Sequence, residues 1–303
     1  MAALDLFFAA RPMLQLPIWT VYLVSLHYHH LKTGESFVLA DLLMMAGISL
    51  LFTGAVYLNQ VYDYESDSIN AKLGFLQKGY LTQRQLQNGF LIVSLLPLIA
   101  APFISIFVLF LFAQFVVLAY TYSAPPLRLK DRAIPGLIAN GYAHGTLVAM
   151  AVLPNLDIHN VGLIGWDVPA YFFLTVGAVY ILTTIPDCDG DAATGKKTLA
   201  VVIGRGGSLV VAVVLLVTSV LVAYASRQAE LVYLSLFAIM LVLAALFLRN
   251  DASVRLAAKA PLFALTLLAG YYYWGYILFV VALILATRAY YFKRFGVIYP
   301  EMN

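Results

Sequence analysis

Residues 38–67 read VLADLLMMAGISLLFTGAVYLNQVYDYESD, a long apolar run that ends in a cluster of carboxylates. The apolar part, residues 38–60, has the roughly 20 residues that a helix needs to cross the hydrocarbon of a bilayer. At its end, Asn59, Asp63 and Asp67 recur at every fourth position, so a continuing helix would carry them on one face. The stretch therefore predicts a membrane-spanning helix with an oxygen-rich face at one end.

The composition of the whole chain agrees with a membrane protein. Of 303 residues, 63% are hydrophobic and 11% are charged, with a mean hydropathy of +0.89, whereas a soluble domain has about 45–50% apolar and about 25% charged residues. The apolar runs are continuous rather than alternating, which excludes a β-barrel. No basic surface interleaved with aromatic residues is apparent, so no nucleic-acid partner is expected. Cys188 has no second cysteine with which to form a disulfide or a metal site.

The apolar runs predict an all-α, polytopic membrane protein with about nine transmembrane helices. The first run has no basic segment before it and no cleavage site after it, so we expect a retained helix rather than a signal peptide. The last run contains GYYYWGY and is either one long helix or one broken at its glycines. The predicted spans cover residues 13–30, 38–60, 87–103, 104–122, 134–153, 169–187, 207–225, 230–248 and 261–290.

The basic residues predict an orientation. Cytoplasmic loops of membrane proteins are enriched in Lys and Arg, and most of the 18 basic residues fall on the side of the N-terminus and the even-numbered loops. We therefore expect this side to be cytoplasmic and the membrane to be the cell membrane. Nine spans would place the C-terminus on the opposite side, where Arg288, Lys293 and Arg294 are an exception to the bias.

A second acidic cluster matches the first one. The stretch IPDCDGDAATGKKT, residues 185–198, follows the sixth predicted span, as the first cluster follows the second. Each cluster thus ends the second helix of a four-helix group. This arrangement favours two parallel pseudo-repeats, at about 1–132 and 133–248, with a final helix at 261–290 and a central cavity between the halves. We expect residues 1–303 to form a single domain.

Carboxylates paired in this way indicate a bound cation. Asp187 and Asp191 repeat the four-residue spacing of Asp63 and Asp67. Polar helix ends at the membrane surface would explain one aspartate, but clustered carboxylates repel each other unless a cation neutralises them. Mg²⁺ binds one or two carboxylates together with phosphate oxygens, so the clusters predict a diphosphate bridged by magnesium. The charge bias of the loops explains most basic residues on the same side, and we expect only one or two to contact the diphosphate, Lys130 and Lys78 before the others. The residues that could contact it are Lys72, Lys78, Arg128, Lys130, Arg132, Lys196 and Lys197.

Three motifs make the sequence resemble the UbiA superfamily of membrane-embedded prenyltransferases. The motifs are Asn59-x3-Asp63-x3-Asp67, Asp187-x3-Asp191 and YSAPPLRLKDR at residues 122–132, similar to the family's segments after the second, sixth and fourth helices. The resemblance covers predicted spans one to eight. The loop after the first motif lacks the Arg-Pro pair that members with aromatic acceptors often carry.

The resemblance implies a Mg²⁺-dependent enzyme that moves an isoprenyl group from a polyprenyl diphosphate, through an allylic cation, to a lipophilic acceptor in the lipid bilayer. The acceptor would be a quinone-precursor aromatic or a glycerophosphate lipid, and no protein partner is required. The metal ligands implied are Asn59, Asp63, Asp67, Asp187 and Asp191, of which the four aspartates are also the catalytic residues. The substrate-binding residues expected are Asn59, Lys78, Tyr122, Ser123, Lys130, Asn140, His144 and Lys196.

Within that set, Asn140 and His144 lie four residues apart inside the fifth predicted span. A buried polar pair in a membrane helix either contacts a substrate or forms hydrogen bonds between helices. We expect these two residues at the acceptor end of the cavity.

Two other classes of function use similar residues. A cation-coupled membrane transporter is the main alternative, because carboxylates between two repeats also suit ion coupling. Coupling sites lie near the bilayer midplane, however, whereas these clusters lie at helix ends. A membrane phosphotransferase would carry Ala-Arg after its Asp-Gly and a further Gly-x3-Asp-x3-Asp, and DGDAATGKKT has neither.

Overall fold

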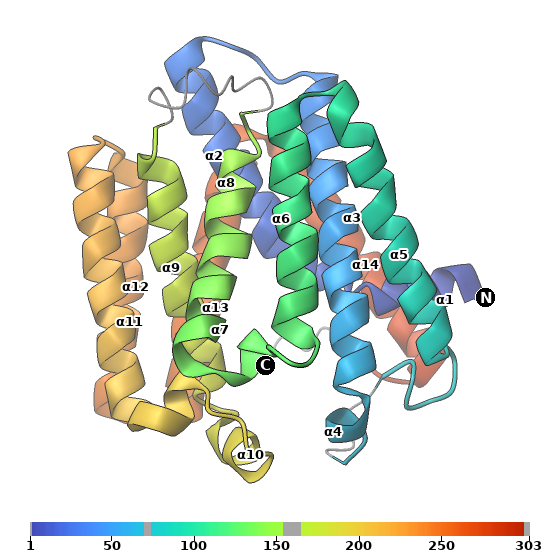
Figure 1. The fold of residues 1–303 in the computed structure, drawn as a ribbon. Helices are drawn as coiled ribbons and strands as arrows, with labels where there is room; N and C mark the ends of the chain where they lie inside the picture. Colours follow the sequence, from blue (N-terminus) through green and yellow to red (C-terminus); the bar gives the residue numbers. More distant parts are fainter. Residues whose placement is uncertain (1, 70–73, 154–164, 300–303) are drawn as a thin grey trace.

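The computed structural model describes residues 2–69, 74–153 and 165–299, and in these residues every regular element is a helix (Figure 1). The long helices are α2 (Leu16–Thr33), α3 (Leu39–Tyr62), α5 (Gln83–Ala100), α6 (Ile106–Ser123), α9 (Asp167–Thr184), α11 (Leu199–Ala225), α12 (Ala229–Leu248), α13 (Asp251–Tyr272) and α14 (Trp274–Phe295). The short ones are α1 (Ala2–Ala9), η1 (Pro12–Gln15), α4 (Tyr64–Ile69), η2 (Ala101–Phe103), η3 (Leu129–Asp131), α7 (Ala133–Asn140), the π-helix η4 (Gly141–Leu147), α8 (Val148–Met150) and α10 (Cys188–Ala193). The expected all-α fold class is confirmed.

Eight helices in the described parts of the chain are long and apolar enough to cross a membrane: α3, α5 with η2, α6, α9, α11, α12, α13 and α14. The protein is therefore an integral membrane protein, as predicted. The predicted spans 13–30 and 134–153 appear as α2 and as the continuous stretch of α7, η4 and α8. Helix α11 bends at Gly204, whose φ of 71° is not helical, so its regular part begins close to the predicted residue 207.

The C-terminal apolar run differs from the single final helix predicted over 261–290. It forms two helices, α13 and α14, which meet at Tyr273, where φ is −131° and ψ is 79°. The chain can reverse there because Gly270 leaves room for the start of α14: a Cβ on Gly270 would lie 2.2 Å from Cγ1 of Ile277. Of the two alternatives for this run, one long helix or one broken at its glycines, the structure has the broken one, so the single helix over 261–290 is wrong.

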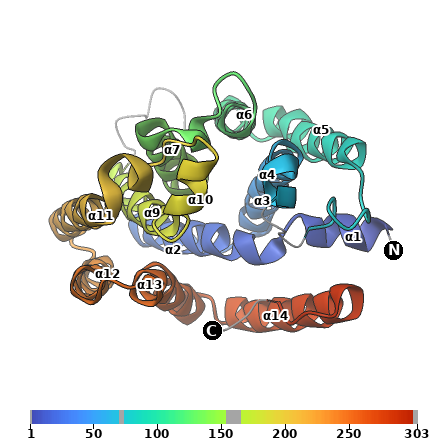
Figure 2. The same ribbon diagram turned by 90° about the horizontal axis from the view of Figure 1, so that it is seen from below.

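The additional helix changes the side on which the C-terminal end lies. Helix α14 crosses the bundle obliquely and ends at the same end as α4 and α10 (Figures 1 and 2). Its last turn packs against the segment that follows α4, with the ring of Phe295 5.1 Å from Phe75 and 5.3 Å from Tyr80. The expectation of a C-terminus opposite the acidic clusters is therefore wrong, and Lys293 and Arg294 no longer violate the charge bias.

A buried ion pair joins the first and last helices at this end. Asp5 of α1, only 2% exposed, accepts hydrogen bonds from the Tyr290 hydroxyl and from Arg294 Nη2, the latter at 2.9 Å. The Arg294 guanidinium also lies 3.6 Å from the ring centre of Tyr80. The pair thus connects α1, α14 and the segment after α4.

We expect Arg294→Met to lower the midpoint of thermal unfolding, measured in detergent by circular dichroism. The substitution leaves the Asp5 carboxylate buried without its cation, and losing one partner of a buried pair costs about 3 kcal/mol or more. Arg255, which is exposed on α13, offers the matched control. Equal midpoints for Arg294→Met and Arg255→Met would contradict the expectation.

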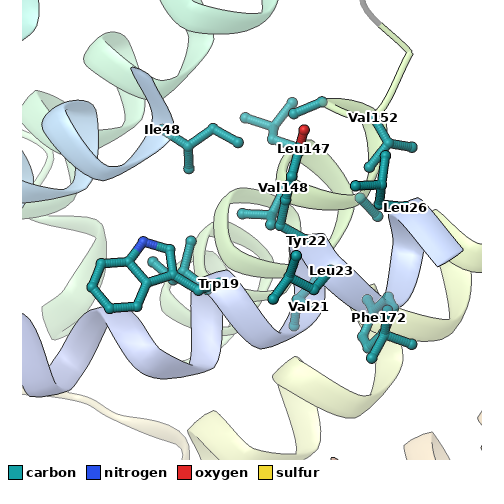
Figure 3. Packing of buried hydrophobic residues seen from close by; sticks show 14 of the residues in the cluster. Trp19, Val21, Tyr22, Leu23, Leu26, Ile48, Leu147, Val148, Val152 and Phe172 are labelled. Atoms are coloured by element: carbon teal, nitrogen blue, oxygen red, sulfur yellow. The ribbon is translucent and has the colours of Figure 1, made fainter. Parts of the chain in front are cut away.

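The largest apolar cluster lies where α2 packs against α8 and α9. Tyr22 and Leu26 of α2 lie close to Leu147 at the end of η4, and Phe172 of α9 belongs to the same cluster (Figure 3). The Tyr22 hydroxyl, which would be costly to bury without a partner, donates to the Asp41 carbonyl oxygen at 3.0 Å. This packing holds in place one end of η4, the helix that carries His144.

Candidate functional site

The first acidic motif keeps its helical spacing across the junction of α3 and α4. Backbone hydrogen bonds run from Asp63 N to Asn59 O at 2.9 Å and from Asp67 N to Asp63 O at 2.8 Å. The three side chains therefore follow each other at intervals of one turn, as the sequence predicted. Glu65, between them, is exposed and lies off this face.

Lys130 joins the third motif to the first one. Its Nζ lies 2.8 Å from Asn59 Oδ1 and 2.6 Å from Asp63 Oδ1, and its side chain is only 9% exposed. Ser123 Oγ lies 3.4 Å from the same Asn59 oxygen. Burial lowers the pKa of Lys130, while the Asp63 carboxylate opposes this effect. An amide oxygen and a carboxylate oxygen thus converge on one cationic group.

Arg128 is a further cation at this point; it was among the predicted basic residues, after Lys130 and Lys78. Its Nη2 lies 3.7 Å from Asp63 Oδ1, and its Nε donates to Asp131 Oδ2 at 2.6 Å. The residue has a left-handed backbone, with φ of 39°, at the start of η3. Because non-glycine residues rarely adopt this conformation, the turn that places Lys130 and Arg128 beside Asp63 is held by its surroundings.

The second acidic motif is arranged like the first one, at the junction of α9 and α10. Asp191 N bonds to Asp187 O at 2.9 Å. The Asp191 carboxylate, 13% exposed, lies 3.1 Å from Lys196 Nζ. Burial acts to lower the pKa of Lys196, but the bond to Asp191 and the charges of Asp191 and Asp63 raise it overall. Lys196 thus interacts with both motifs.

A backbone contact brings the second and third motifs together. Lys197 N donates to Asp131 O at 2.8 Å, within a bridge between Arg132 and Lys197. The loop after α10 is thereby attached to η3, which carries Lys130. All three motifs of the sequence meet at one end of the bundle.

The donor atoms at this end fit a hard divalent cation. In the described parts of the chain, no three His, Cys, Asp or Glu side chains already form a group that could hold a metal ion. Asn59 and Asp63, however, present oxygens to one shared ammonium group, and Asp191 presents another to Lys196. Oxygen ligands of this kind, few in number, suit Mg²⁺ that also binds phosphate oxygens.

Two adjoining cavities extend from the motifs into the bundle. The first, of about 190 Å³, lies between α3, α6, α7 and η4 and is lined by Asn59, Tyr122, Asn140 and His144 among mainly apolar residues. The second, of about 300 Å³, shares Asn140 and His144 and continues between α2, α9, α11, α12 and α13. The motifs therefore lie at the polar end of a largely apolar space, in agreement with the predicted central cavity.

Tyr180 is a cavity residue that sequence analysis missed. Its side chain lines the larger cavity, and Tyr122, in the smaller one, accepts a hydrogen bond of 2.9 Å from Asn140 Nδ2. Tyr180 precedes Asp187 by two helical turns, so the seven-residue spacing would have placed it on the face of the second motif.

The remaining predicted site residues are less close to this centre. Asp187 is exposed at the start of α10, and Lys78 is exposed in the segment between α4 and α5 and lines neither cavity. Lys72 lies outside the described residues. Their roles stay predictions.

Comparisons with known proteins agree with this arrangement. The chain is 28% identical over 250 residues to the lycopene elongase/hydratase of Corynebacterium glutamicum. This alignment covers 76% of the present chain and 85% of that relative. It is 27% identical over 158 residues to the digeranylgeranylglyceryl phosphate synthase of Pyrococcus furiosus. This alignment covers 52% of the present chain and only about half, 54%, of the synthase.

Solved structures share the fold. A UbiA homologue from Archaeoglobus fulgidus bound to DMAPP and Mg²⁺ superposes with a TM-score of 0.65 at 19% identity, covering 86% of this chain and 97% of that one. The apo structure of a UbiA homologue from Aeropyrum pernix superposes with a TM-score of 0.66 at 20% identity, covering 82% of this chain and 94% of that one. The sequence model of the UbiA prenyltransferase family matches residues 17–265. Since this match spans most of the chain, the protein belongs to the UbiA prenyltransferase family.

Proposed function

We propose that this prenyltransferase is Mg²⁺-dependent and moves an isoprenyl group from a polyprenyl diphosphate to a lipophilic acceptor inside the membrane. The observation that carries the proposal is the position of Asn59, Asp63 and Lys130 at the polar end of two adjoining, mainly apolar cavities. A diphosphate fits the polar end, and an isoprenyl chain fits the apolar space.

The metal would be held by the two acidic motifs, by Asn59, Asp63 and Asp67 of the first and by Asp187 and Asp191 of the second. Bound Mg²⁺ would neutralise the charge that develops on the departing diphosphate. The Archaeoglobus fulgidus homologue bound to DMAPP and Mg²⁺ supports this assignment for the present chain.

The cationic side chains complement the same charge. Lys130 is already paired with Asp63 of the first motif and Lys196 with Asp191 of the second, so their positions cost little reorganisation when a diphosphate binds. Arg128 lies beside Asp63 and adds a third cation. Together these groups favour cleavage of the bond between C1 of the isoprenyl chain and the diphosphate oxygen.

The cavity walls protect the allylic cation that this cleavage leaves. Tyr122 lines the smaller cavity and Tyr180 the larger one, and Asn140 donates to the Tyr122 hydroxyl. The Tyr122 hydroxyl thus has its hydrogen-bond partner within the protein and does not need a water molecule for it. A site without water limits the competing hydrolysis of the cation, and aromatic faces favour a positive charge.

The acceptor is a glycerophosphate lipid or a quinone-precursor aromatic. The digeranylgeranylglyceryl phosphate synthase of Pyrococcus furiosus favours the lipid. We also propose that the chain forms one domain of two pseudo-repeats, and that the motifs face the cytoplasm, because most basic residues lie at their end.

The direct test offers purified protein geranyl, farnesyl and geranylgeranyl diphosphate with Mg²⁺ and a panel of lipid and aromatic acceptors, followed by mass spectrometry. We expect one product with the mass of acceptor plus isoprenyl group minus one hydrogen. If no diphosphate is bound or consumed with any acceptor, the proposal is wrong.

A further inference from the structure

His144 lies where the two cavities adjoin, and the conformation of the helix that carries it determines its position. It belongs to the π-helix η4, and π-helical turns are rare and occur frequently at functional sites. Both His144 and Asn140, one turn before it, line both cavities. The imidazole is therefore open to whatever occupies either space.

Two glycines explain how η4 presents His144 to the cavity. A Cβ on Gly145 would lie 2.4 Å from the Phe172 carbonyl oxygen, and a Cβ on Gly141 would lie 2.9 Å from that of Phe173. The backbone of η4 is thus in direct contact with the backbone of α9 along its glycine face. This close contact fixes the helix and leaves His144 on the face that lines the cavities.

The imidazole of His144 has no hydrogen-bond or ion-pair partner within the described residues. Its ring lies edge-on to the ring of Phe52, and the two ring centres are 5.3 Å apart. Neighbouring polar groups are different: Asn140 donates to Tyr122 and to the Gly136 carbonyl oxygen. Thr175, in the larger cavity, donates to a backbone carbonyl of its own helix.

An imidazole without a partner offers one donor and one acceptor nitrogen. A polar group in an apolar space is costly unless something satisfies it, and a bound molecule can do so here. Arg11 lines the smaller cavity only, and the larger one, where its lining is described, contains no Lys or Arg, so an anionic group in the larger cavity would stay uncompensated. A hydrocarbon would leave the imidazole unsatisfied. A neutral hydroxyl group satisfies it.

We propose that His144 is the catalytic proton acceptor of the reaction and that the group beside it is the hydroxyl of a lipid acceptor. The inference rests on the proposed prenyl transfer. The hydroxyl oxygen forms a bond to C1 of the isoprenyl group, while the bond from C1 to the diphosphate oxygen breaks and its electron pair leaves with the diphosphate. The hydroxyl proton passes to the free imidazole nitrogen, and from there to water after the products leave.

The test compares wild type, His144→Ala and His144→Gln, with geranylgeranyl diphosphate and Mg²⁺ as donor and geranylgeranylglyceryl phosphate or lycopene as acceptor. His27→Ala is the matched control, since His27 stacks on Tyr272 and lines neither cavity. The readouts are kcat and KM for each acceptor, calorimetric binding of the donor, and the thermal midpoint.

We expect prenylation of the hydroxyl acceptor by wild type and His27→Ala. His144→Gln should keep KM within about threefold and lose about 10²- to 10⁴-fold in kcat, the usual contribution of a general base. His144→Ala should lose kcat equally, with donor binding unchanged in both variants. The inference is overturned if His144→Gln keeps the wild-type kcat, or if donor binding falls as much as kcat does. Prenylation of lycopene but not of the hydroxyl acceptor would overturn it as well. A wild type that binds no donor would instead refute the proposed function.

Discussion

Asp63→Asn is expected to lower kcat/KM for the prenyl diphosphate by about 10³-fold. The substitution keeps the shape of the side chain and an oxygen for Lys130 but removes the charge that would hold a divalent cation. A bound metal ion supplies several kcal/mol of transition-state stabilisation, and about 4 kcal/mol corresponds to about 10³ in rate. Initial rates of diphosphate release at several donor concentrations measure the effect.

The matched control is Glu65→Gln, which removes a carboxylate two residues away that is exposed and lies off the motif face. It should retain wild-type kcat/KM. Asp191→Asn, in the second motif, should resemble Asp63→Asn. If Asp63→Asn and Asp191→Asn both keep wild-type rates while folding normally, the carboxylates do not form the proposed metal and diphosphate site.

Removal of divalent cations by EDTA is expected to abolish turnover, a loss of at least about 10³-fold, and added Mg²⁺ should restore it. A diphosphate beside two carboxylate motifs is strongly repelled without metal ions. The measurement is product formation in metal-depleted buffer, before and after titration with MgCl2.

The fold should survive the same treatment. Asp63 lies 2.6 Å from Lys130 Nζ and Asp191 lies 3.1 Å from Lys196 Nζ, so each of these two carboxylates keeps a cationic partner when the metal is removed. We therefore expect EDTA to leave the thermal midpoint within a few degrees. Full turnover in excess EDTA would refute the role of the metal, and a collapse of the midpoint would show that the ion is structural.

The family assignment decides between the alternatives raised by the sequence. The chain belongs to a prenyltransferase family, which removes the grounds for a cation-coupled transporter. The position of Asp63 and Asp191 at helix junctions, beyond the ends of α3 and α9, agrees with that outcome.

Local patterns were predicted well because their physical cause is local. A run of about 20 apolar residues forms a helix in a bilayer wherever it lies in the chain, and α3, α6 and α12 begin and end within a few residues of the prediction. The four-residue spacing of each acidic motif depends on the helical repeat alone. The sequence left open whether the last run is broken, because a reversal inside an apolar run depends on how Gly270 and Ile277 pack.

The sequence by itself determined a helical membrane protein with two acidic motifs of helical spacing and a resemblance to one enzyme family. Tertiary structure alone decided that Lys130 lies between Asn59 and Asp63, that α14 returns the chain to the end of the motifs, and that His144, without a hydrogen-bond partner among the described residues, lies at the junction of two cavities. The reason is physical. Hydropathy and helical spacing are properties of neighbouring residues, whereas these contacts join segments far apart in the chain and depend on how closely the helices pack.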